Sequence, residues 1–187
     1  MHNIAITGSF ASGKSFVLEL LQSMGCEVFS CDDYVKNIYE DLSVQKIVES
    51  SIEGLEKFNK KKLAEIIYNN PIARKILEDI VHPMVLRAIK EFERQNKDED
   101  FIFTEVPLLF ESGFDKYFLY SICVFCSEAT REERSKSRSS FNPIIFEKIK
   151  KIQFSQDDKK NRANFAIDSE QKKEIIEKDL KEIMEKI

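Results

Sequence analysis

Short apolar runs alternate along the chain with longer stretches in which apolar residues recur at helical spacing. The runs at residues 3–7, 28–31, 101–106, 121–126 and 165–168 predict buried strands. The stretches between them predict helices, and the last of these is amphipathic, with apolar residues at positions 175, 176, 180, 183, 184 and 187. The alternation is typical of an α/β fold with a parallel sheet.

Glycine and proline mark several of the predicted helix boundaries. A helix over about 14–24 is expected to stop at Gly25, which suits the left-handed position after a helix end. Pro71 and Pro83 each predict a helix start, because proline fits the first helical turn. Residues 34–96 show no strand pattern and are longer than one crossover needs, so we interpret them as a helical insertion.

Composition and charge narrow the class of protein. The 187 residues are 42% apolar and 33% charged, which suits one globular domain with small insertions. A formal net charge of −4 argues against a general nucleic-acid binder, and no apolar run reaches the length of a membrane span. The four cysteines, with no basic leader before residue 3, suggest reduced thiols, so we expect a cytoplasmic protein without nucleic-acid or membrane partners.

A phosphate-binding motif lies between the first predicted strand and the first predicted helix. Residues 8–15 read G-S-F-A-S-G-K-S and match G-x-x-x-x-G-K-[ST]. The glycines let the backbone turn so that loop amides cradle phosphate oxygens at the positive end of the helix. In such loops Lys14 reaches the β- and γ-phosphates and the Ser15 hydroxyl ligates Mg²⁺, which predicts ATP and Mg²⁺ as ligands.

The motif alone does not separate kinases from other nucleotide hydrolases. A GTPase would need Asn-Lys-x-Asp after a strand, whereas residues 96–99 lack the final Asp and precede a strand. A motor or transporter ATPase would need a longer chain. A small domain with a helical insertion and a late basic segment fits a small-molecule kinase better.

Carboxylates at the ends of predicted strands are the candidates for the acceptor and the metal. Asp32 and Asp33 follow the second strand, and each is either a base for the acceptor hydroxyl or a helix cap, with Asp33 the better cap. Glu105 ends the third strand, where it is either a metal-side carboxylate or an ion-pair partner. Glu111 is a weaker candidate of the same kind.

A basic segment over residues 131–151 offers positive charge to a transferred phosphoryl group. Arg134 and Arg138 are four apart and share one helix face. Such arginines belong either to a mobile lid or to a solvated face, and the phosphate loop favours the lid. Cys123 and Cys126 lack a second cysteine pair at zinc spacing and are interpreted as buried thiols.

Five segments, in order along the chain, resemble the motifs of one family. Residues 4–15 are similar to I-x-L-T-G-G-I-G-S-G-K-S, residues 25–32 to G-x-x-V-I-D-A-D, residues 62–83 to K-L-x-x-I-V-F…L-E-x-I-x-H-P, residues 105–111 to D-V-P-L-L-F-E, and residues 153–168 to Q-x-x-x-x-x-K-x-x-x-A-D-x-V-I-D. The family is dephospho-coenzyme A kinase. The H-P and P-L-L-F-E strings are not general features of phosphate-loop proteins, so the resemblance is specific.

The resemblance implies a fold, a reaction and a set of site residues. The fold would be a phosphate-loop NTPase-type parallel sheet flanked by helices, with core 1–33 plus 97–128 plus 161–187, a CoA-binding insertion 34–96 and a lid 129–160. The reaction would be ATP-dependent phosphorylation of the ribose 3′-hydroxyl of dephospho-CoA, the last step of CoA synthesis, in a monomer with at most weak self-association. The implied catalytic residues are Asp32, Lys14, Arg134 and Arg138; the ATP-binding residues are Gly8, Ser9, Phe10, Ala11, Ser12, Gly13, Lys14, Ser15, Phe16 and Asp168; the acceptor-binding residues are Asp32, His82 and Leu108; and the Mg²⁺ candidates are Ser15, Asp32 and Glu105.

The chain also departs from the family pattern. Ser9 and Ala11 stand where the family has glycine, Phe16 replaces a hydroxyl residue, and Ser30 and Glu105 each replace an aspartate. The late Ala-Asp pair becomes Ala-Asn at residues 163–164. Two alternatives therefore stay open: a nucleoside monophosphate-type kinase, and a nucleotide-sensing module with little turnover.

Overall fold

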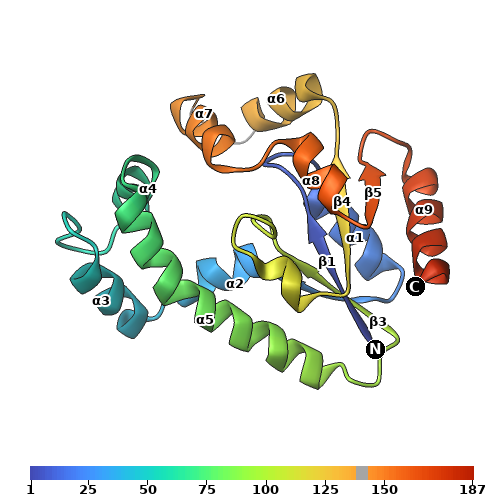
Figure 1. Ribbon diagram of the computed structural model, residues 1–187, viewed down its shortest axis with the longest axis horizontal. Helices are drawn as coiled ribbons and strands as arrows, with labels where there is room; N and C mark the ends of the chain where they lie inside the picture. Colours follow the sequence, from blue (N-terminus) through green and yellow to red (C-terminus); the bar gives the residue numbers. More distant parts are fainter. Residues whose placement is uncertain (138–142) are drawn as a thin grey trace. The chain divides into compact units, whose positions relative to one another are not determined.

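The computed structural model describes residues 1–137 and 143–187 of the chain. Within these residues the strands form one five-stranded parallel sheet in the order β2-β3-β1-β4-β5 (Figure 1). The strands are β1 (His2–Thr7), β2 (Glu27–Ser30), β3 (Phe101–Glu105), β4 (Tyr120–Phe125) and β5 (Phe165–Asp168). The predicted α/β parallel sheet is confirmed, with β2 and β4 each one residue earlier than the pattern suggested.

Helices occupy most of the remaining described residues. They are α1 (Lys14–Ser23), α2 (Cys31–Ile38), α3 (Leu42–Ser51), α4 (Lys60–Asn69), α5 (Pro71–Gln95), α6 (Glu128–Lys136), α7 (Pro143–Ile152), α8 (Gln156–Arg162) and α9 (Lys173–Lys186), with a short 3₁₀ helix, η1 (Phe114–Tyr117). Helix α1 stops as predicted, because Gly25 takes a left-handed φ of 85°. The amides of Gly25 and Cys26 then bond back to the carbonyls of Gln22 and Leu21, both at 3.0 Å.

The predicted helix start at Pro83 is wrong. Helix α5 begins at Pro71, as expected, and continues through Pro83 to Gln95. An interior proline removes one backbone hydrogen bond and costs about 3 kcal/mol in an otherwise regular helix. The helix carries a continuous stripe of buried residues at four-residue spacing on both sides of the proline, namely Ala73, Leu77, Val81, Val85 and Ile89. Burial of that stripe outweighs the single lost bond.

The chain divides into two compact units, of which the first contains the sheet. This unit comprises Met1–Ser30 and Glu93–Ile187. Helices α1 and α9 both pack on one face of the sheet, where their apolar residues join those of β1, β3, β4 and β5 in one core (Figure 1). Leu21, Ile176 and Leu180 are completely buried there. The second unit, Cys31–Phe92, contains α2, α3, α4 and most of α5.

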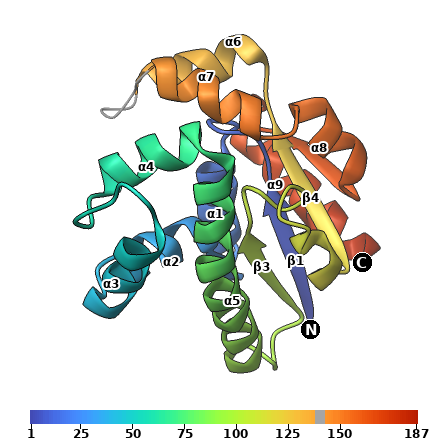
Figure 2. The same ribbon diagram turned by 60° about the vertical axis from the view of Figure 1, so that its left-hand side comes forward.

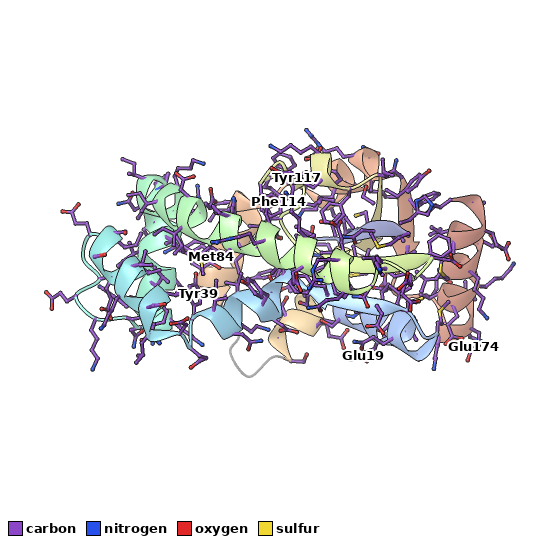
Figure 3. All side chains as sticks on the ribbon, turned by 90° about the horizontal axis from the view of Figure 1, so that it is seen from below. Glu19, Tyr39, Met84, Phe114, Tyr117 and Glu174 are labelled. Carbon is purple, nitrogen blue, oxygen red and sulfur yellow. The ribbon has the colours of Figure 1, made fainter. Side chains whose placement is uncertain are left out.

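The opposite face of the sheet is lined by buried polar groups. Strands β3, β1 and β4 run side by side (Figure 2), and the Thr104 hydroxyl of β3 donates to Asn3 Oδ1 of β1 at 2.8 Å. On β4, the Ser121 amide and hydroxyl donate to Asn164 Oδ1 at 2.9 and 3.1 Å. In η1, after β3, the rings of Phe114 and Tyr117 lie edge to face, with 5.9 Å between their centroids (Figure 3). None of the described helices is long and apolar enough to cross a membrane.

Candidate active site

Residues 8–13 form a tight loop between the end of β1 and the start of α1. Two glycines are required by its geometry. A Cβ on Gly8, whose φ is 153°, would lie 2.3 Å from the carbonyl oxygen of Val124 on β4. A Cβ on Gly13, whose φ is 94°, would lie 2.6 Å from the Ser169 hydroxyl oxygen. The loop therefore packs directly against β4 and against the residue that follows β5, and only glycine fits at these two positions.

Ala11 occupies a left-handed conformation within this loop. Its φ is 62°, and among the described residues it is the one non-glycine residue whose φ is positive. The conformation costs an L-residue with a Cβ about 1–2 kcal/mol, a cost that glycine avoids. The loop thus holds backbone strain at one buried alanine, where the family pattern has glycine.

The lysine and the first turn of α1 present positive charge and donors to the loop. Lys14 is 9% exposed, and its Nζ donates to the carbonyls of Gly8 and Ser9 at 3.1 and 3.2 Å. The N-cap residue Gly13 makes no side-chain cap, and a helix start of this kind suits an anion. Ser15 is exposed on this turn. Among the described residues, the buried Ser12 hydroxyl has no hydrogen-bond partner, as expected of a loop built around a polar ligand.

Arg134 of α6 lies against the loop through Ser169. Its guanidinium donates to the Ser169 hydroxyl at 2.7 Å and to the Ser169 carbonyl at 3.0 Å. The Ser169 hydroxyl donates in turn to the Ser12 carbonyl at 2.7 Å. The structure therefore brings Arg134 next to Gly13, whereas Arg138 lies outside the described residues.

Glu105 is the carboxylate that the sheet places near the loop. It ends β3 and is a register partner of Ile6 on β1 and of Ser30 on β2. It is 6% exposed, and the Ser30 hydroxyl donates to its Oε2 at 2.5 Å. Serine at position 30 thus orients the glutamate in the place where the family pattern has two aspartates.

The donor set fits Mg²⁺ bound largely through nucleotide phosphates. No group of three or more His, Cys, Asp or Glu side chains in the described residues forms a metal cage. Mg²⁺ bound with nucleotides takes one or two protein oxygens, phosphate oxygens and waters. The Ser15 hydroxyl and the Glu105 carboxylate are oxygen donors of this kind at the carboxyl edge of the sheet.

Asp32 and His82 belong to the Cys31–Phe92 unit. Asp32 is exposed in the first turn of α2. Its negative charge, added to the larger effect of burial, raises the pKa of the Tyr68 phenol in the same unit. Asp33, the better cap of the two candidates, lies inside α2, which begins at Cys31, and pairs with Lys36 at 2.7 Å. His82 is half-buried, and burial lowers its pKa.

The remaining predicted site residues lie in the sheet-containing unit. Leu108 is half-buried in the turn after β3, and Phe16 is 37% exposed on α1. Asp168 ends β5 and accepts the Glu170 amide at 2.9 Å. Cys123 and Cys126 are buried free thiols, as predicted, and burial raises the pKa of Cys123 to about 11.

Three residues contact the loop although no direct contact was predicted for them from the sequence. These are Ser169, Arg131 and Gln153. Arg131 Nε donates to the Phe10 carbonyl at 3.1 Å, and Gln153 Oε1 accepts the Phe10 amide at 3.0 Å. Gln153 opens the fifth family-like segment and Arg131 opens the basic segment, which were the available signals, whereas nothing in the local sequence distinguishes Ser169.

Comparison with known proteins identifies the family. A family model described as dephospho-CoA kinase matches residues 2–174. The chain belongs to the dephospho-CoA kinase family. A dephospho-CoA kinase of Rickettsia bellii is 43% identical over 166 residues, covering 89% of this chain and 87% of that protein. One from Fusobacterium nucleatum is 34% identical over 189 residues, covering 98% and 97%.

Solved structures share the fold of this member of the dephospho-CoA kinase family. TT1252 from Thermus thermophilus superposes with a TM-score of 0.84 at 27% identity, covering 100% of this chain and 97% of that one. Dephospho-CoA kinase from Campylobacter jejuni has a TM-score of 0.65 at 24% identity, covering 98% and 95%. Shikimate kinase from Aquifex aeolicus, at 18% identity and a TM-score of 0.52 over 98% and 96%, shares the fold alone.

Proposed function

We propose that the chain transfers the γ-phosphoryl group of ATP to the ribose 3′-hydroxyl of dephospho-CoA, giving CoA. The observation that carries this proposal is the family match over residues 2–174, which includes the intact phosphate loop. The loop supports ATP as donor, since its sequence motif, its buried Lys14 and the start of α1, which has no side-chain cap, are the features that bind phosphates in such loops.

The charged groups around the loop carry the electrostatic part of the transfer. Lys14 and Arg134 neutralise charge that develops on the moving phosphoryl group, and Arg138 is proposed to join them. Phosphoryl transfer requires little covalent chemistry from a protein, so positioning and charge dominate. When bound, Mg²⁺ neutralises the β- and γ-phosphate oxygens, and Ser15 and Glu105 are the residues of the loop unit proposed to hold it, with Asp32 as a further candidate.

Asp32 is proposed to accept the proton of the 3′-hydroxyl. Its position in the first turn of α2 leaves the carboxylate exposed, so it is accessible to an acceptor. His82 and Leu108 are proposed acceptor contacts, and Asp168 is proposed to lie by the adenine of ATP. Residues 34–96 would form the CoA-binding domain and residues 129–160 the lid of a monomeric cytoplasmic enzyme.

Matched aspartate variants and an acceptor panel test the proposal. ADP release from Mg-ATP is measured with dephospho-CoA, AMP, CMP or UMP, and CoA is identified as product. We expect stimulation by dephospho-CoA alone, and a loss of at least about 100-fold in kcat for Asp32→Asn with little change in ATP binding. Asp33→Asn is the matched control, because Asp33 pairs with Lys36.

The alternatives have distinct outcomes in the same assay. Stimulation by a nucleoside monophosphate would indicate that class of kinase. ATP binding without stimulation by any acceptor would indicate a nucleotide sensor. Full activity of Asp32→Asn together with an inactive Asp33→Asn would indicate that Asp33, and not Asp32, accepts the proton.

A further inference from the structure

Phe10, in the middle of the phosphate loop, is held by side chains that come from more than 120 positions later in the chain. Gln153 Oε1 accepts its amide at 3.0 Å, and Arg131 Nε donates to its carbonyl at 3.1 Å. Its ring packs at 6.0 Å between centroids on Phe146, which is 6% exposed on α7. The peptide groups on both sides of one loop residue are therefore fixed from outside the loop.

Arg131 and Gln153 form a clamp on Phe10, and the Arg131 side chain is itself braced. The Arg131 side chain is 7% exposed, and its Nη1 pairs with Glu128 Oε2 at 2.6 Å. Lys150 of α7 pairs with the other oxygen of Glu128 at 2.8 Å. Gln153 lies in the short connection between α7 and α8. A buried, ion-paired arginine is a rigid donor, because its rotamers are already restricted.

Arg131 acts on the peptide that leads into the strained residue, Ala11, and Gln153 acts on the peptide before it. Carbonyl and amide point in opposite directions across a trans peptide, and the described residues contain no cis peptide. When Arg131 holds the Phe10 carbonyl, the Ala11 amide is turned away from Arg131. This fixes the orientation of a loop amide at the residue whose φ is 62°.

We propose that Arg131 and Gln153 are positioning residues that hold the phosphate loop in its binding conformation and offset the left-handed strain at Ala11. Without the clamp, Ala11 favours right-handed or extended backbone, and the fraction of loops able to bind phosphate falls. The apparent dissociation constant rises in inverse proportion to that fraction. The inference rests on the proposed use of the loop as the ATP site.

The test measures nucleotide binding without acceptor. Isothermal titration calorimetry with the magnesium complex of the β,γ-imido analogue of ATP is applied to wild type, Gln153→Met, Arg131→Met and Gln22→Met. We expect each clamp variant to bind about three- to tenfold more weakly, the scale of one net hydrogen bond. Gln22→Met, an exposed change on α1, is the control and should bind as wild type does.

A second set of variants separates positioning from general damage. In an Ala11→Gly background the same Gln153→Met change should weaken binding by less than about twofold, since glycine adopts the left-handed conformation without strain. In the kinase assay the KM for ATP should rise while kcat at saturating ATP stays within about twofold. Equal losses in both backgrounds, or wild-type affinity in both clamp variants, would overturn the proposal.

The acceptor panel keeps this test distinct from the test of the reaction. A wild-type chain that binds the analogue without phosphorylating dephospho-CoA would refute the proposed reaction and leave the clamp test intact. A wild-type chain that binds no nucleotide would overturn the clamp as well.

Discussion

The buried ion pair between Lys159 and Glu111 offers a prediction whose size follows from the structure. Lys159 of α8 is completely buried, and its Nζ lies 2.9 Å from Glu111 Oε1. The same Nζ donates to the Pro107 carbonyl at 2.5 Å, two residues after Glu105. Burial lowers the pKa of Lys159, and the negative charge of Glu111 opposes that effect. The pair therefore fastens the segment after β3 to α8.

Replacing Lys159 with methionine leaves the charged Glu111 carboxylate buried without its cation. The carboxylate is 10% exposed and would retain the Phe154 amide, at 2.8 Å, as its hydrogen-bond donor among the contacts described. Its second oxygen, Oε2, is buried without a partner even in the intact pair. Removing one partner of a buried pair costs about 3–5 kcal/mol, and we expect about 3 kcal/mol because the glutamate retains slight exposure.

The assay is thermal and urea unfolding followed by circular dichroism. For a chain of this size, about 3 kcal/mol corresponds to a fall of about 6–12 °C in Tm. Glu111→Gln/Lys159→Met should recover at least about 1 kcal/mol relative to the sum of the single variants, because it leaves no buried charge. Lys160→Met is the matched control, because it removes the charge of a neighbouring lysine that is exposed. The Lys160 ammonium lies over the Phe125 ring, 4.0 Å from its centroid. A loss below about 1 kcal/mol for Lys159→Met, or additive losses in the double variant, would refute the reasoning.

Two further predictions concern the loop and the second unit. Gly13→Ala should lower affinity for Mg-ATP by at least about tenfold in a binding titration, because its Cβ would lie 2.6 Å from the Ser169 hydroxyl and its φ is 94°; unchanged affinity would contradict the described loop geometry. His82 has its pKa lowered by burial from the ordinary 6.5, so the unfolded chain takes up the proton first as pH falls through 6.5. Wild type should therefore lose stability relative to His82→Asn between about pH 7 and pH 5.5 in urea unfolding, and parallel curves would show that His82 does not contribute.

The strands and the phosphate loop were predictable because their signals are local. The apolar run before Gly8 and the G-K-S string specify a strand, a turn and a helix start within a few residues. Pro83 was misread for the same reason, because a local rule treats a proline as a helix start. The buried stripe that carries α5 through it extends over the whole helix.

Most partners of the loop could not be predicted from local sequence, because the order of the strands in the sheet decides them. Strand β1 lies in the middle of the sheet with β4 beside it and β5 next. Since all the strands are parallel, the segments that follow β4 and β5 emerge at the same edge as the loop that follows β1. Arg131 and Ser169 reach the loop by that route, and no spacing in the sequence indicates that their side chains do so. Arg134, which the family resemblance implied, arrives by the same route.

Several residues that depart from the family pattern form specific contacts in the structure. Ser30 and Glu105 both differ from aspartate, and they are register partners joined by a hydrogen bond of 2.5 Å. One carboxylate is lost, and the remaining one is longer and has a donor to orient it. Asn164, in place of an aspartate, accepts both donors of Ser121 on β4. Ala11 keeps the left-handed turn directly after Phe10, whose amide and carbonyl are both held by side chains from outside the loop. Changes paired in this way preserve the conformation that phosphate binding needs, which favours a working kinase over a nucleotide sensor derived from one.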